Sequence, residues 1–87
     1  MVFTLIKYSK RYVEVTARFT ADGDIIPLKI LWHDGSVFFI DRVLDIRPAA
    51  SLKAGGAGIR YTCRISNRET YLFLEENRWF VEEKYTE

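Results

Sequence analysis

The stretch that decides the fold is Tyr12-Val-Glu-Val-Thr-Ala-Arg-Phe-Thr20, followed by Ala21-Asp22-Gly23-Asp24. Its apolar residues alternate with polar ones at a period of two, which is typical of a β-strand with one buried face. Asp22-Gly23 supplies residues that tolerate positive φ and predicts a tight hairpin turn. Counting outward from this turn pairs apolar residues with one another: Phe19 with Ile26, Ala17 with Leu28, Val15 with Ile30, and Val13 with Trp32.

The same pattern recurs along the chain. Asp34-Gly35 predicts a second turn, which pairs Trp32 with Val37 and Ile30 with Phe39 and gives a three-stranded meander over residues 12–46. Residues 47–58 lose the alternation and are rich in Ala and Gly, so we expect a connecting loop there. Alternation resumes at Ile59, and turns at Asn67-Arg68 and Glu76-Asn77 predict a second meander over residues 58–84, which pairs Cys63 with Leu72, Tyr61 with Leu74, and Leu74 with Trp79.

Two such meanders predict an all-β protein. We expect residues 1–87 to form a single small domain, a β-barrel or roll of about six antiparallel strands, because curling hides the edges of so short a sheet. For the first eight residues the sequence leaves two alternatives: a seventh strand, or a segment that covers the sheet.

Length and composition narrow the protein class. A chain of 87 residues with 48% hydrophobic residues and a net charge of +1 is typical of a small globular domain. Its single cysteine excludes an internal disulfide. Apolar runs such as Val37 to Ile40 fall far short of the roughly 20 residues of a membrane helix, and the N-terminus has no signal-cleavage pattern. We therefore expect a cytoplasmic protein without a membrane partner.

The outer face of the second meander is the first candidate site. The registers place Phe73 beside Phe80 there, with Tyr71 close by, and place Phe38 on the outer face of the first meander. An exposed apolar patch of this kind is expected to be shielded from solvent by another surface. Either the N-terminal segment or the 47–58 loop folds over it, or it is a partner interface, for which a second copy in a homodimer is the simplest occupant.

Basic residues make a second candidate site. Residues 42–68 contain one acidic side chain, Asp45, against six basic ones: Arg42, Arg47, Lys53, Arg60, Arg64 and Arg68. With Tyr61 or Tyr71 as a stacking residue, Arg47, Lys53, Arg60, Arg64 and Arg68 are candidates for binding an anion or nucleic acid. The registers set Arg60 opposite Glu75 and Arg64 beside Glu82, so Arg47, Lys53 and Arg68 are the better candidates among them.

Residues that would support catalysis are sparse. His33 has no further ligand spaced to share a metal, and Cys63 points into the predicted core as a small apolar residue. Lys53 to Gly58 is glycine-rich but lacks the Gly-Lys-Ser/Thr ending of a P-loop. Asp41 and Asp45 could act as a pair of catalytic acids, but a small filled barrel offers no evident cleft to enclose them. We expect no enzyme, no metal site and no cofactor.

Several segments together resemble a family of small, functionally uncharacterised bacterial all-β proteins. They are Pro27 to Arg47, Arg60 to Arg64, Tyr71 to Glu75 and Arg78 to Phe80, within a likeness that extends over about three quarters of the chain. More remotely, Trp32, Gly35, Val43 to Asp45, Arg64 and Trp79-Phe80 are similar to a β module that accompanies Y-family-polymerase-like DNA repair proteins. The second resemblance implies recruitment or DNA association rather than chemistry.

Two functional hypotheses follow. The first is a non-enzymatic binding or interaction module that self-associates through the surface around Phe73 and Phe80. The alternative is a small barrel that binds nucleic acid through its basic residues and is linked to DNA repair.

Overall fold

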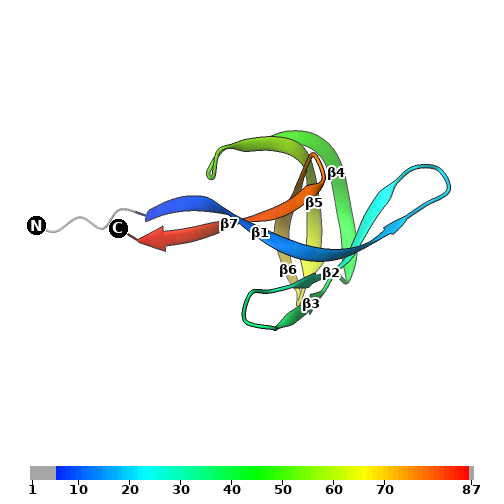
Figure 1. Ribbon diagram of the computed structural model, residues 1–87, viewed down its shortest axis with the longest axis horizontal. Helices are drawn as coiled ribbons and strands as arrows, with labels where there is room; N and C mark the ends of the chain where they lie inside the picture. The colour runs from blue at the N-terminus through cyan, green and yellow to red at the C-terminus, as the bar shows by residue number, and fades with distance from the viewer. Residues whose placement is uncertain (1–5, 87) are drawn as a thin grey trace, which may run out of the picture.

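The computed structural model describes residues 6–86, and these form one antiparallel sheet (Figure 1). Its seven strands are β1 (Ile6–Phe19), β2 (Ile25–Leu31), β3 (Val37–Phe39), β4 (Arg42–Ser51), β5 (Gly56–Ile65), β6 (Arg68–Glu75) and β7 (Arg78–Thr86). Their order across the sheet is β3-β2-β1-β7-β6-β5-β4. The all-β prediction is confirmed, with seven strands where about six were expected.

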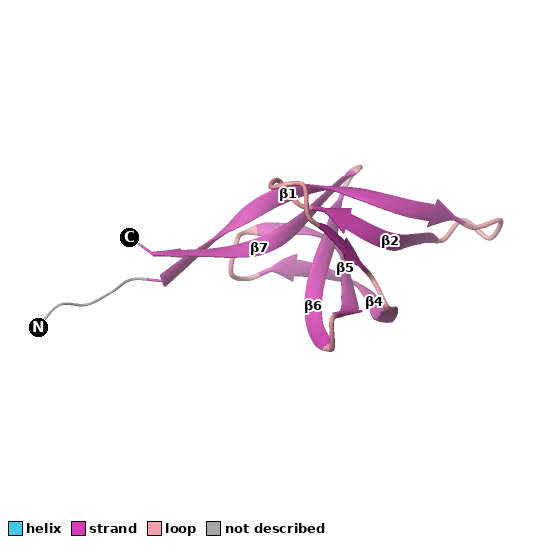
Figure 2. Ribbon diagram, turned by 90° about the horizontal axis from the view of Figure 1, so that it is seen from below, coloured by secondary structure: helices cyan, strands magenta, loops and turns pink. Residues whose placement is uncertain are grey.

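The sheet curls into a half-barrel, so that strands from its two ends approach each other (Figure 2). The segment between β3 and β4 crosses from one end to the other. Ile40 N–H donates to the carbonyl of Leu28 on β2, and Asp41 N–H donates to the carbonyl of Arg64 on β5, both at 2.9 Å. This crossing divides the expected third strand into β3 and β4, which accounts for the additional strand.

Strand β1 is shared between two neighbours. Ile6 to Val13 pair with β7, and Glu14 to Phe19 pair with β2. The β1–β7 ribbon projects from the body of the molecule in Figure 1. Of the first eight residues, whose role the sequence left open, Ile6 to Tyr8 belong to this strand. Residues 1–5 lie outside the described residues.

The first two turns hold three residues instead of the expected two. Thr20 N–H donates to Asp24 O at 2.9 Å, and Gly23 has a φ of 92°. This is the three-residue loop that ends in a left-handed residue. It shifts the pairing by one, so that Ala17 lies opposite Pro27, and a bulge between Thr16 and Ala17 then restores the expected pair of Val15 with Ile30.

The turn at Asp34-Gly35 has the same form, with no bulge to compensate. Trp32 N–H donates to Ser36 O at 2.7 Å, and Phe38, not Phe39, lies opposite Ile30. A shift of one residue exchanges the two faces of a strand. Phe38 therefore lies on the concave side against Trp32, with ring centroids 6.4 Å apart, which corrects its expected outward position.

The second meander keeps its expected faces although one turn moves. Ser66 and Asn67 both adopt positive φ, so the turn lies one residue earlier than Asn67-Arg68. Moving a turn by one residue shifts the pairing by two, so Tyr61 lies opposite Leu72 rather than Leu74, on the same face. The expected pair of Leu74 with Trp79 is confirmed.

The concave side holds the main core. Its buried residues are Ile30, Tyr61, Cys63, Leu72, Leu74 and Val81. The Tyr61 hydroxyl donates to the carbonyl of Ile25 at 2.7 Å, which satisfies this buried polar group and ties β5 to β2. Of the residues that the sequence predicts to share a dry interior, Ile30, Cys63, Leu72 and Val81 are buried, and Val15 is partly buried against them.

Phe73 and Phe80 form a second buried layer on the convex side, which contradicts the prediction that they are an exposed partner interface. Their rings stack at 4.9 Å with an interplanar angle of 7°, and they are 1% and 0% exposed. Of the four residues assigned to that interface, Tyr71 and Phe38 remain exposed, at 45% and 41%.

Residues 47–58, which we expected to be a connecting loop, form the ends of two strands beside this layer. Strand β4 continues to Ser51 and β5 begins at Gly56. The hairpin tip (residues 51–57) bends back over the convex side in Figure 1. Ser51 Oγ donates to Glu82 at 2.8 Å, and Ala57 N–H donates to Glu75 at 3.2 Å. Tyr12 lies edge-on to Phe80 at a centroid distance of 5.9 Å, and Lys10 Nζ lies 5.3 Å from the centroid of the same ring. The alternative in which the chain itself covers the aromatic pair is therefore the one observed.

Truncation of Phe80 tests this second layer. Replacing a fully buried phenylalanine by alanine removes about 3–5 kcal/mol of unfolding free energy. We expect Phe80→Ala to lose that amount in urea unfolding monitored by circular dichroism, and we expect Phe38→Ala to lose clearly less because its ring is 41% exposed. Equal losses in the two variants would show that the covering contact has been assigned wrongly.

Candidate functional site

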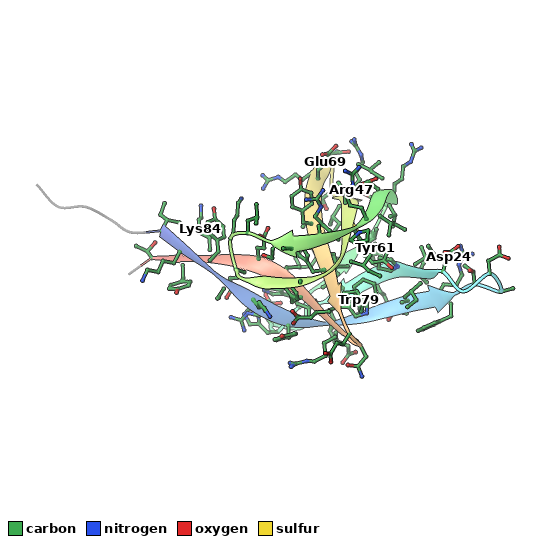
Figure 3. The ribbon with its side chains drawn as sticks, turned by 90° about the horizontal axis from the view of Figure 1, so that it is seen from above. Asp24, Arg47, Tyr61, Glu69, Trp79 and Lys84 are labelled. Carbon is green, nitrogen blue, oxygen red and sulfur yellow. The ribbon has the colours of Figure 1, made fainter. Side chains whose placement is uncertain are left out.

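Four arginine side chains gather on the convex side of β4 and β5. We call Arg42, Arg47, Arg60 and Arg64 the arginine face. On β5, Arg60 and Arg64 alternate with the buried Tyr61 and Cys63, so they point away from the core. The ladder sets Arg42 opposite Arg64 and Arg47 opposite Arg60. In Figure 3, Arg47 lies on the same side of the molecule as Glu69 of β6, away from Tyr61.

A bulge in β4 produces this arrangement. Val43 faces the core opposite Cys63, so strict alternation would also turn Asp45 inward. The register instead slips between Val43 and Asp45, which leaves Leu44 as the additional residue. Asp45 then lies opposite Thr62, and Arg47 follows on the same outward row. The bulge therefore keeps the charged residues of β4 out of the core.

The arginine face is poorly neutralised. Arg47 Nε contacts Asp45 Oδ2 at 2.6 Å. Within residues 6–86, no ion pair within 4.0 Å engages Arg42, Arg60 or Arg64. The expected opposition of Arg60 and Glu75 is wrong, because Arg60 lies opposite Phe73. Like charges directly opposite each other destabilise a sheet. With Asp45 beside Arg47 and Glu69 opposite Arg64, the four arginines still exceed the neighbouring carboxylates, so the face remains positive.

Asp45, Tyr71 and Glu69 neighbour these charges, with Glu69 opposite Arg64 on β6. The hydrogen bond from Arg47 lowers the pKa of the Asp45 carboxyl, and the charge of Arg60 lowers it further. The Arg60 guanidinium lies 4.5 Å from the centroid of the Tyr71 ring, and its Nε is buried without a hydrogen-bond partner in the described part of the chain. Tyr71 is 45% exposed, whereas Tyr61 is buried and cannot stack on a ligand.

The remaining predicted anion-binding residues lie elsewhere. Lys53 is in the hairpin tip, with its Nζ 4.9 Å from the centroid of the Tyr8 ring. Arg68 lines a groove of about 620 Å³ on the concave side, together with Trp32 and Phe38. The structure thus brings together Arg47, Arg60 and Arg64 of the predicted set and adds Arg42. The sequence missed Arg42 as a site residue because β4 was assigned to the wrong neighbour.

Glu75 anchors the hairpin tip that supports this face. It accepts hydrogen bonds from Lys10 Nζ at 2.9 and 3.1 Å, from Tyr12 Oη at 3.0 Å and from Ala57 N–H at 3.2 Å. These bonds, with that from Lys10 the strongest, lower the pKa of the Glu75 carboxyl. The same side chain therefore joins β1, β6 and the start of β5.

This anchor predicts a pH dependence. A carboxyl whose pKa is lower in the folded state contributes stability above its unfolded pKa and loses it as the pH falls through the folded pKa. We expect wild type to lose more stability than Glu75→Gln in urea titrations between about pH 7 and about pH 3. Glu14→Gln, on an exposed position of β1, serves as the control and should follow wild type. Identical pH profiles for all three proteins would contradict the role of Glu75.

Cys63 is buried and chemically protected. Its side chain is 0% exposed, and burial raises the pKa of the thiol to about 11. Within the described residues, no group of three or more His, Cys, Asp or Glu side chains could hold a metal ion. His33 packs against Trp32 at a centroid distance of 5.0 Å. The core assignment of Cys63 from the sequence is confirmed.

The protection of Cys63 can be measured directly. With a pKa of about 11, roughly one thiol in a thousand is ionised at pH 8, and the ionised form is the nucleophile. We expect iodoacetamide to leave the folded protein unmodified in a time that fully alkylates it in urea, as followed by mass spectrometry. Alkylation at the same rate in both conditions would contradict the burial of this residue.

Comparison of the chain with protein-family models, curated proteins and solved structures finds no match. The relationship to a polymerase-associated β module therefore stays a prediction from the sequence. The part of the chain that the structure describes contains no helix that is long and apolar enough to cross a membrane.

Proposed function

We propose that this protein is a non-enzymatic binding module whose arginine face binds nucleic acid. The observation that carries the proposal is the opposition of Arg42 to Arg64 and of Arg47 to Arg60. A fold that holds like charges opposite each other on an exposed face gains most from a ligand that carries closely spaced negative charges.

The spacing of the two arginine pairs favours a polymer over a single anion. Arg60 and Arg64 are four residues apart on β5, which corresponds to roughly 13 Å at the rise of a strand. Each strand of a nucleic acid duplex carries one phosphate per about 3.4 Å of its axis, so the two pairs span several phosphates. Guanidinium groups also suit phosphate oxygens, which they bind in a bidentate manner.

Tyr71 distinguishes nucleic acid from other polyanions. It lies opposite Thr62, in the row between the two arginine pairs, and 45% of its surface is exposed. An aromatic ring beside a basic track is the arrangement on which unpaired bases stack. The resemblance to a repair-associated β module also favours nucleic-acid binding. Self-association through Phe73 and Phe80 is not proposed, since both rings are buried within the chain.

Salt dependence and substitution test the proposal. If the four arginines each contact a phosphate, the affinity for a single-stranded or duplex oligonucleotide should fall about 50- to 150-fold between 50 and 200 mM salt, as measured by fluorescence anisotropy. Arg42→Gln with Arg64→Gln should roughly halve the slope of log affinity against log salt. The control, Lys29→Gln with Arg68→Gln, removes the same charge outside the arginine face and should leave the slope close to wild type.

Tyr71→Leu separates base stacking from charge. We expect it to weaken single-stranded oligonucleotide binding about 5- to 150-fold and to leave heparin binding unchanged. Absence of oligonucleotide binding at about 50 mM salt would contradict the proposed function. Equal losses for the arginine-face pair and the control pair would contradict the assigned surface.

A further inference from the structure

Strand β4 is an edge of the sheet and offers a place for another strand. Among residues 6–86 it pairs only with β5, although it is ten residues long. Edge strands of this kind carry unpaired N–H and C=O groups that can pair with another chain. A groove of about 670 Å³ lies between β2 and this strand, and its lining includes Leu28, Leu44 and Ile46, which are each more than a third exposed.

Pro48 indicates which backbone groups face this free edge. Proline has no N–H to donate, so within a sheet its nitrogen faces away from the neighbouring strand. Ile46 lies two residues earlier in a register that is continuous from Asp45 to Ser51. Its N–H and C=O therefore point in the same direction as the nitrogen of Pro48, toward the open edge. Ile46 is 45% exposed.

The charges around Ile46 are self-complementary. Asp45 and Arg47 flank it, and their contact at 2.6 Å places both side chains on the same face. When two copies of this strand pair antiparallel about a twofold axis at Ile46, Asp45 of each copy lies opposite Arg47 of the other. A twofold interface of this type presents one surface to itself, so each favourable contact occurs twice.

The two neighbouring irregularities limit the possible registers. The bulge between Val43 and Asp45 bends the strand on one side of Ile46. Pro48 removes a donor on the other side. Two copies of β4 can therefore pair without interruption only around residues 45–47. Centring the pair on Ile46 matches both charges and uses both of its backbone groups.

We propose that the free edge of β4 binds a second copy of this chain and forms a twofold dimer centred on Ile46. The two Ile46 residues exchange backbone hydrogen bonds, Asp45 and Arg47 make two reciprocal ion pairs, and the two sheets continue into each other across β4. This interface is separate from the buried Phe73–Phe80 pair. The short contact implies a weak, concentration-dependent dimer.

Charge reversal gives a sharp test by sedimentation equilibrium. Wild type should shift from 10.2 kDa toward twice that mass as the concentration rises. Asp45→Arg opposes Arg with Arg, and Arg47→Asp opposes Asp with Asp, so each variant alone should dimerise at least about tenfold more weakly. An equimolar mixture of the two variants restores both ion pairs and should form a heterodimer. Asp45→Arg combined with Arg47→Asp in one chain should dimerise like wild type.

Ile46→Pro tests the backbone pairing independently. This substitution removes an N–H that faces the edge, as Pro48 already does, so folding should be retained by circular dichroism while the dimer is lost. Wild type that stays at 10.2 kDa up to about 1 mM overturns the proposal. So does a dimer that persists in both single charge variants, or a mixture of the two that remains monomeric while both are folded.

Discussion

The burial of the stacked Phe73–Phe80 pair on the convex side is the interaction on which the rest of the structure depends. A curled sheet of seven strands has an inner layer around Leu72 and Cys63, and the stacked rings form a second layer on the opposite side. Leaving two phenylalanine side chains exposed would forfeit about 1.5–3 kcal/mol each. Tyr12 and Lys10 lie over Phe80 and Tyr71 lies against Phe73. The hairpin tip is held beside them by Glu75 and Glu82, and its two strands carry the arginine face.

The bend of the β4–β5 hairpin requires a close approach that the sequence provides. Gly58 lies opposite Ala49 on β4, and a Cβ at this position would overlap the backbone oxygen of Leu74. A glycine here lets β5 pass close to β6 before the tip turns over the sheet. The Ala- and Gly-rich composition of residues 47–58, which suggests a flexible loop, instead permits dense backbone packing. A segment with small side chains and no apolar–polar alternation can therefore be a strand that packs closely on another layer.

The sequence predicted the features that depend on local pattern. The period-two alternation identified the strands, and the inward residues Ile30, Cys63, Leu72 and Val81 are buried as expected. Features that change when the strand pairing shifts by one residue could not be predicted from this pattern. An Asx-Gly pair fits both a two-residue and a three-residue loop, and the choice decides whether Phe38 or Phe39 faces the core. The partner of β4 depends on how the sheet closes, which no local pattern encodes.

One strand connects the fold with both proposed surfaces. The bulge at Leu44 turns Asp45 and Arg47 outward together, and both the arginine face and the free edge depend on that turn. Asp45 then has two roles that oppose each other: it partly neutralises Arg47 on the proposed nucleic-acid surface, and it supplies the charge that a second copy would recognise. In a dimer each Arg47 lies near two carboxylates, so dimerisation weakens the phosphate contact at Arg47 while it leaves Arg42 and Arg64 free. Because both equilibria use Arg47, nucleic-acid binding and dimerisation are coupled. If the dimer binds nucleic acid more weakly than the monomer does, nucleic acid weakens dimerisation by the same factor.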